Sequence, residues 1–165
     1  MQAGKVVEMQ ALWDIPELML QAGAWPIVPS LGREWHVPGP ATQDGLVQAP
    51  RDEARSQSSR QLVQAMLAGL AKFATDGVDA MELEKFWHPR FSWYGPSGIG
   101  TSRGIAGFRN WHQIPFLSGM PDRKGTGGKG NYFADGDYVG FTAWPGMSAS
   151  ITSDGWLGIA PSGQK

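Results

Sequence analysis

The middle of the chain carries apolar residues at helical spacing. Between Ser58 and Ala74 they recur every three or four positions, which predicts an amphipathic helix with one face turned to a core. The positions on that face are Leu62, Val63, Met66, Leu67, Leu70 and Phe73. Asp79 and Glu82 stand three residues apart, as in a capping box, and predict a second helix that ends near Trp87.

A third helix is predicted further along the chain. Its apolar face is marked by Ile105, Phe108, His112 and Phe116. Pro115 must bend or shorten this helix, because proline lacks a backbone N–H and crowds the preceding turn. A short aromatic strand around Trp93 precedes it.

After residue 122 the pattern changes to strands. We predict strands over 131–134, 138–144, 147–152 and 155–159. Asp135 and Gly136, between the first two, are a strong hairpin signal. Helices followed by an antiparallel meander indicate the α+β class. Such a sheet must bury one face against the helices, and a curved sheet wrapped on helices leaves a pocket between them.

The N-terminal part is organised differently. Residues 5–15 show period-2 character with β-branched side chains and predict a strand, and residues 16–22 predict a short helix. Prolines, glycines and polar residues then break every pattern, which indicates a linker or an extended arm. The predicted units are 1–24 (strand plus short helix), 25–57 (linker) and 58–165 (main domain).

Composition narrows the function classes. The chain has 165 residues, a net charge of about −1 with both signs dispersed, and no cysteine. Without a basic stripe, nucleic-acid binding is not expected. Disulfides, thiolate catalysis and Cys-based metal sites are excluded. No stretch approaches the roughly 20 apolar residues that cross a bilayer, and no signal-peptide core follows Met1. We expect a soluble, cytoplasmic α+β domain that binds neither membranes nor nucleic acid.

Motif searches exclude several chemistries. The chain has no G-x-S-x-G elbow and no G-x-x-x-x-G-K-[ST] or G-x-G-x-x-G phosphate loop. Its three histidines are scattered without i,i+4 pairing. We therefore expect no cofactor and no metal. The run 86–122 is the most suggestive stretch, because it gathers four of the chain's tryptophan and tyrosine residues around two histidines. Such a cluster is compatible with a small-molecule pocket and with an ordinary core.

Several separated motifs in the C-terminal two thirds resemble one family. They are WYGPSGIGTSRGIAGF, HQIPFL, MPD, the hairpin, AWPGM and GWLGIAPSGQ. Together they resemble the SnoaL-like polyketide cyclases of the nuclear-transport-factor-2-like superfamily, from about Ser58 to Lys165. The resemblance implies a cone-shaped domain in which three helices and a curved antiparallel sheet enclose a pocket. It also implies cofactor-free ring closure of a polyketide ester by intramolecular aldol condensation.

The chain departs from this family in two places. The family domain continues past a PSGQK-like turn into two more strands, whereas this chain stops at Lys165, and its N-terminal GKVVEMQALWDIPELMLQAG resembles the missing last strand. Either the chain is an out-of-register piece of a tandem-repeat protein, or residues 5–15 fold back as a permuted strand. An open sheet edge then favours a homodimer or a neighbouring repeat as partner. Ile151 also stands where family members often carry a histidine.

Two residues are candidate catalytic groups. His112 lies on the inward face of the third helix and is either a buried neutral histidine or a proton shuttle. Asp14 either caps the helix at 16–22 or acts as a base whose pKa is raised by a dry pocket; we favour the cap.

The candidate substrate-binding residues are aromatic, and core packing is the alternative for each. They are Trp93, Tyr94, Phe108, Phe116, Trp144 and Trp156. Trp93 and Tyr94 alternate along a strand, so only one of them can face a pocket. The predicted activity is cofactor-free acid/base chemistry, an aldol cyclisation or isomerisation, on a hydrophobic carbonyl compound. The alternative is a non-catalytic binding or assembly domain.

Overall fold

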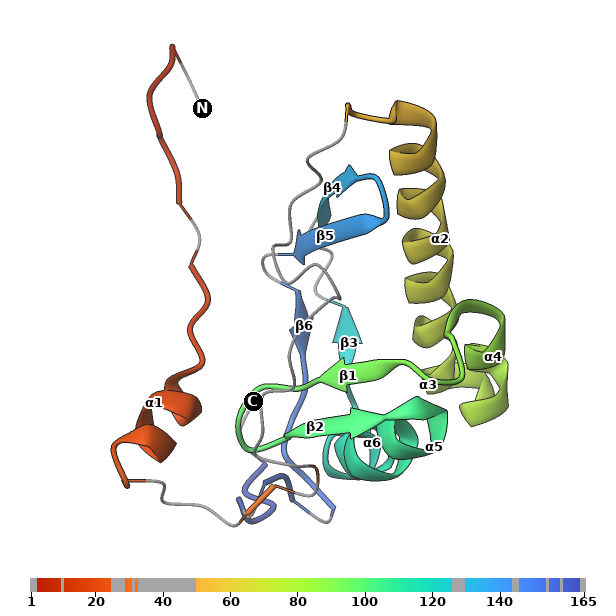
Figure 1. Ribbon diagram of the computed structural model, residues 1–165. Coiled ribbons are helices and arrows are strands. Elements are labelled where there is room, and N and C mark those ends of the chain that lie inside the picture. Colours follow the sequence, from red (N-terminus) through yellow and green to blue (C-terminus); the bar gives the residue numbers. More distant parts are fainter. Residues whose placement is uncertain are drawn as a thin grey trace.

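The computed structural model describes residues 3–9, 11–24, 29–30, 32, 50–125, 130–143, 146–153, 155–157 and 159–163. Helices and short antiparallel strands are mixed along the chain, which is compatible with the predicted α+β class (Figure 1). No described helix is long and apolar enough to span a membrane.

The first predicted helix of the main domain is confirmed. Helix α2 runs over Glu53–Ala71 and begins before the predicted start at Ser58, because the Asp52 carboxylate caps it by accepting from the Arg55 N–H at 2.9 Å. A short helix, α3 (Phe73–Asp76), follows after Lys72. The predicted linker over 25–57 is therefore too long at its end, because the chain is already helical from residue 53.

The capping box predicted at Asp79 and Glu82 is wrong. A 3₁₀ turn covers Val78–Met81, Glu82 has a left-handed backbone with φ of 50°, and α4 then covers Leu83–Phe86. Met81 and Leu83 are both buried. Residues two apart point to different sides of a helix, so the chain must break between them for both to enter the core.

A small hairpin comes next. Strands β1 (Ser92–Tyr94) and β2 (Thr101–Arg103) pair antiparallel, with Trp93 opposite Ser102. The predicted strand around Trp93 is confirmed. Its partner β2 was not predicted, because the glycines and serines around it give no strand pattern. The two strands lead the chain directly into the third helical segment.

That segment is helical throughout but changes its winding. Helix α5 (Gly104–Phe108) passes into a π-helical turn (Arg109–Gln113) and then into α6 (Ile114–Gly119). The Ile114 N–H donates to the Arg109 carbonyl, five residues back. Pro115 explains this, because its ring would strike the carbonyl four residues earlier in a regular α-helix and the wider turn moves that carbonyl away.

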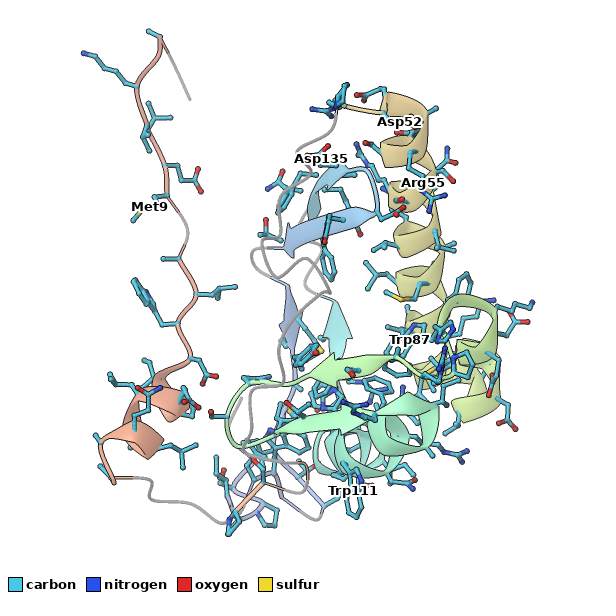
Figure 2. All side chains as sticks on the ribbon, viewed as in Figure 1. Met9, Asp52, Arg55, Trp87, Trp111 and Asp135 are labelled. Carbon is cyan, nitrogen blue, oxygen red and sulfur yellow. The ribbon has the colours of Figure 1, made fainter. Side chains whose placement is uncertain are left out.

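The predicted Asp135-Gly136 hairpin is confirmed. Strands β4 (Gly130–Asp135) and β5 (Tyr138–Ala143) pair in register across a two-residue turn. The turn is fastened to the first turn of α2: the Gly136 N–H donates to the Ser56 hydroxyl at 2.9 Å, and Arg55 forms an ion pair with Asp137. Figure 2 shows this end of α2, with Asp52 and Arg55, facing the hairpin side that carries Asp135.

The predicted strand over 147–152 is shorter than expected. Strand β6 covers Met147–Ser148 and pairs with β3 (Lys124–Gly125). Beyond it, backbone groups bind non-strand partners: the Ser150 N–H donates to the Asp122 carboxylate at 2.8 Å, and the Thr152 N–H donates to the Gly119 carbonyl at 2.8 Å. These bonds replace a strand ladder.

The predicted strand over 155–159 is wrong. The Trp156 N–H donates to the Ile159 carbonyl at 3.0 Å, and the Ile159 N–H donates to the Trp156 carbonyl at 2.8 Å. Leu157, between them, has a left-handed backbone with φ of 53°. This is a tight turn. Within the described residues the strands form three two-stranded sheets, β1–β2, β3–β6 and β4–β5, instead of one continuous sheet.

The N-terminal segment also differs from its prediction. Apart from an isolated bridge at Lys5, residues 5–9 and 11–14 form no strand, and the large apolar side chains of this stretch are exposed, Trp13 at 81%. The predicted helix is confirmed as α1 (Ile15–Gln21), which buries no residue. Figure 1 shows the segment before α1 extending away from the other elements. A strand needs a partner, and no described sheet edge lies beside this segment.

The core lies where α2, α4 and α5 meet. Its buried apolar residues are Met81, Leu83 and Phe108. Partly buried neighbours complete it: Leu70, Phe73, Val78, Trp87, Phe91, Trp93 and Ile105. Three of these residues, Leu70, Phe73 and Phe108, also line the cavity described next.

Candidate functional site

A cavity of about 680 Å³ lies between the helices and the short strands, within the size range of small-molecule sites. Its wall draws on α2, α3, the segment from α5 to α6, and strands β3, β5 and β6. The lining residues are Leu67, Leu70, Ala71, Phe73, Phe108, His112, Gln113, Phe116, Leu117, Arg123, Lys124, Gly125, Phe141, Gly146 and Met147. The surface is mostly apolar, and no aspartate or glutamate is among these described lining residues.

The π-helical turn brings two polar residues to the cavity together. His112 and Gln113 both line it, although they are neighbours in sequence. Trp111, the residue before them, is exposed on the outer side (Figure 2). Helical turns of this kind occur often at functional sites, because the wider winding changes which side chains share a face.

His112 sits within a cluster of aromatic rings. Its imidazole stacks on Trp93 with ring centroids 4.3 Å apart and on Phe116 at 5.4 Å. Phe108 lies at 5.3 Å and Trp156 at 6.2 Å. Four of the predicted substrate-binding residues therefore surround the predicted catalytic histidine.

Burial controls the charge of His112. Desolvation lowers the pKa of His112 from 6.5 to about 4, because the aromatic surroundings disfavour the imidazolium ion. Its Nδ1 atom is buried and has no hydrogen-bond partner among the described residues. At neutral pH the ring is therefore uncharged, with one N–H donor and one acceptor nitrogen.

Gln113 adds a second unsatisfied polar atom. This residue is only 6% exposed, and its Nε2 donates to the sulfur of Met81 at 2.8 Å. Its Oε1 is buried and bonds to no described group. Buried polar atoms without partners are costly and rare in folded proteins. Both residues line the cavity, but neither of these atoms is accessible in this conformation, so a ligand with polar groups reaches them only when the side chains rotate.

Trp156 reaches the cluster through a close approach of two glycines. A Cβ atom at Gly119 would lie 2.3 Å from the Gly155 carbonyl oxygen, so only glycine fits there. The contact places the end of α6 against the turn that carries Trp156, whose ring meets Phe116 edge-on at 5.4 Å. This is why Trp156 joins the cluster although it lies in no strand.

The structure thus assembles part of the predicted site. His112, Phe108 and Phe116 line the cavity, and Trp93 and Trp156 pack on the His112 ring. Tyr94 is 46% exposed, as the strand alternation with Trp93 requires. Trp144 lies outside the described residues. Gln113 and Arg123 were not predicted as site residues, and no sequence pattern separates them from ordinary surface residues.

Asp14 is not brought to this cavity. It caps α1, accepting from the Glu17 N–H at 3.1 Å, as its preferred interpretation predicts. Its other oxygen accepts from the Ser97 N–H at 3.0 Å, which ties α1 to the loop between β1 and β2. The structure therefore does not pair Asp14 with His112.

The described residues contain no group of three or more His, Cys, Asp or Glu side chains close enough to hold a metal ion. No family model, curated protein or solved structure matches this chain.

Proposed function

We propose that this chain is a SnoaL-like domain of the cone-shaped type, whose cavity binds a hydrophobic, ring-containing carbonyl compound and promotes proton transfer at the carbon next to the carbonyl. No cofactor takes part. The single observation that carries the proposal is the environment of His112: a neutral imidazole, stacked between aromatic rings, with a buried unpaired Nδ1 at an apolar cavity.

In this proposal each group has a distinct role. The aromatic rings around His112 hold the flat part of the substrate by burial and offset stacking. The imidazole accepts a proton at one nitrogen or donates one from the other. A rotation of the Gln113 side chain brings its Oε1, which is buried in the structure, to accept from a hydroxyl or enol of the substrate. A polyketide is the substrate class that the sequence resemblance implies.

The second candidate is a non-catalytic binding domain of the same fold. It is supported by the absence of carboxylates from the described lining residues, because a catalytic histidine is usually oriented by such a partner. Lowering the pKa of His112 to about 4 also makes it a weak base at neutral pH.

One experiment separates the two candidates. The protein is incubated with tetralone, a bicyclic ketone with exchangeable protons next to its carbonyl, in deuterated buffer, and exchange is followed by proton NMR. Binding is measured in parallel from the quenching of tryptophan fluorescence. His112→Gln is the test variant, and His88→Gln, at an exposed histidine outside the cavity, is the matched control.

The enzyme proposal expects exchange in the wild type and in His88→Gln, and at least a roughly tenfold slower rate in His112→Gln, within the usual contribution of acid/base catalysis. Binding without exchange identifies the binding domain. Absence of both binding and exchange contradicts both candidates.

A further inference from the structure

Arg123 is the most unusual charged residue of the cavity. It follows α6 and lines the wall, with its guanidinium group over the rings of Phe73 at 5.0 Å and Phe116 at 5.7 Å. Its Nη1 donates to the Met120 carbonyl at 3.3 Å. The same Phe116 ring that stacks on His112 therefore also supports this cation.

The charge of Arg123 has no counter-ion among the described residues. Its neighbour Asp122 is directed elsewhere, accepting from the N–H and hydroxyl of Ser150 at 2.8 and 2.7 Å. Partial burial lowers the pKa of Arg123, which reflects a cation that has lost water without gaining a carboxylate. An arginine carries five N–H donors, and only one bond from it to a described group is formed.

The surroundings of Arg123 are positive as well. Lys124, the next residue, lines the same cavity, and no acidic side chain does so among the described residues. An apolar cavity with cations at one side fits a ligand that is hydrophobic over most of its surface and anionic at one end. A guanidinium group binds a carboxylate through two parallel hydrogen bonds.

We propose that the ligand of this cavity carries a carboxylate and that Arg123 binds it, with His112 and its aromatic neighbours holding the rings. This rests on the proposed function and names the substrate class for the same site.

The test compares two ligands that differ in charge and by one methyl group: a carboxylated tetralone and its methyl ester. Affinity for each is measured by fluorescence quenching with wild type, Arg123→Gln and Arg123→Lys. The matched control is Arg60→Gln, since Arg60 is also partly buried and lies over an aromatic ring, Tyr132 at 5.8 Å, but is not part of this cavity.

We expect the acid to bind wild type and Arg60→Gln about tenfold more tightly than the ester, the size of one charge-assisted interaction. Arg123→Gln should lose this preference while it still binds the ester. Arg123→Lys, which keeps the charge and loses the paired donors, should retain part of it. If Arg123 had a purely structural role, its substitution would weaken the binding of both ligands and leave the ratio of their affinities unchanged.

The outcomes distinguish this inference from the proposed function. Equal binding of acid and ester to wild type, or an acid preference that survives in Arg123→Gln, overturns the role of Arg123 and leaves the proposed function standing. If neither ligand binds wild type, the proposed function fails and the inference falls with it. If Arg123→Gln does not fold, as judged by circular dichroism, the acid-to-ester ratio in wild type and Arg123→Lys decides: the inference requires a ratio that decreases in the lysine variant.

Discussion

The imidazole of His112 lies nearly face to face with the indole of Trp93, with ring centroids 4.3 Å apart and planes inclined by 21°. Trp93 comes from β1 and His112 from the π-helical turn, so the contact joins the small hairpin to the third helical segment. It also removes water from one face of the histidine and so contributes to the desolvation that lowers the pKa of His112.

The first prediction concerns the titration of His112. Its NMR resonance should titrate with a pKa of about 4 in the folded protein, against 6.5 in an unfolded chain. Between these values the unfolded state binds more protons, so folding stability should be fully present above pH 6.5 and fall as the pH drops toward 4. We expect the free energy of unfolding to fall by about 2 kcal/mol over this range. This is less than the full pKa difference implies, because the ring is only partly buried.

Carboxylates titrate over the same range, so the comparison is with His112→Gln. The difference between the two pH profiles of unfolding free energy isolates the histidine. Parallel profiles would show that His112 is hydrated in solution.

The second prediction compares two large aromatic side chains. Phe108 is buried and contacts Trp87, Trp93 and His112, so Phe108→Ala should lower the free energy of unfolding by about 3–5 kcal/mol. Trp13 is 81% exposed, and Trp13→Ala should change it by less than about 0.5 kcal/mol. Urea denaturation followed by circular dichroism measures both. A large loss in Trp13→Ala would mean that the N-terminal segment is packed against a surface.

The third prediction tests the origin of the π-helical turn. Pro115→Ala restores a backbone N–H and removes the clash, so the segment should revert to a regular α-helix. This rotates His112 away from Trp93, and its pKa should move toward 6.5 as water returns. Tetralone binding should weaken by about tenfold or more, because the site is misaligned.

Pro121→Ala is the control for Pro115→Ala, since Pro121 lies after the end of α6 and should leave the His112 titration unchanged. An unchanged titration in Pro115→Ala would show that packing, and not the proline, sets the wider turn.

The fourth prediction concerns the attachment of the β4–β5 hairpin to α2. Ser56 is 2% exposed, and its hydroxyl accepts from the Gly136 N–H and donates to the Asp52 carbonyl at 2.7 Å. Ser56→Ala should cost about 1–3 kcal/mol of unfolding free energy, because the Gly136 N–H loses its partner. Arg55→Ala removes only the exposed ion pair with Asp137 and should have a clearly smaller effect. Equal effects in the two variants would contradict this assignment.

Elements with local determinants could be predicted. The helix that contains Leu62 to Leu70, the Asp135-Gly136 hairpin and the Asp14 cap all depend on residues a few positions apart, and all three are present. The strands predicted at 5–15 and 155–159 are absent from the part of the chain that the structure describes, and local pattern alone could not show this, because a strand requires a partner that the local pattern does not specify. Their patterns are compatible with strands, but neither stretch finds a ladder among the described residues.

The site shows the same division. The periodic face of the third helix is enough to place Phe108, His112 and Phe116 together, because helical spacing is a local property. The position of Pro115 predicts a disturbance of this helix, but only the three-dimensional structure showed that the disturbance is a π-helical turn, which brings Gln113 to the same cavity. The isolation of the Arg123 charge depends on which side chains fold around it. Local sequence thus determined which residues share a face, and long-range packing determined which of them lack partners.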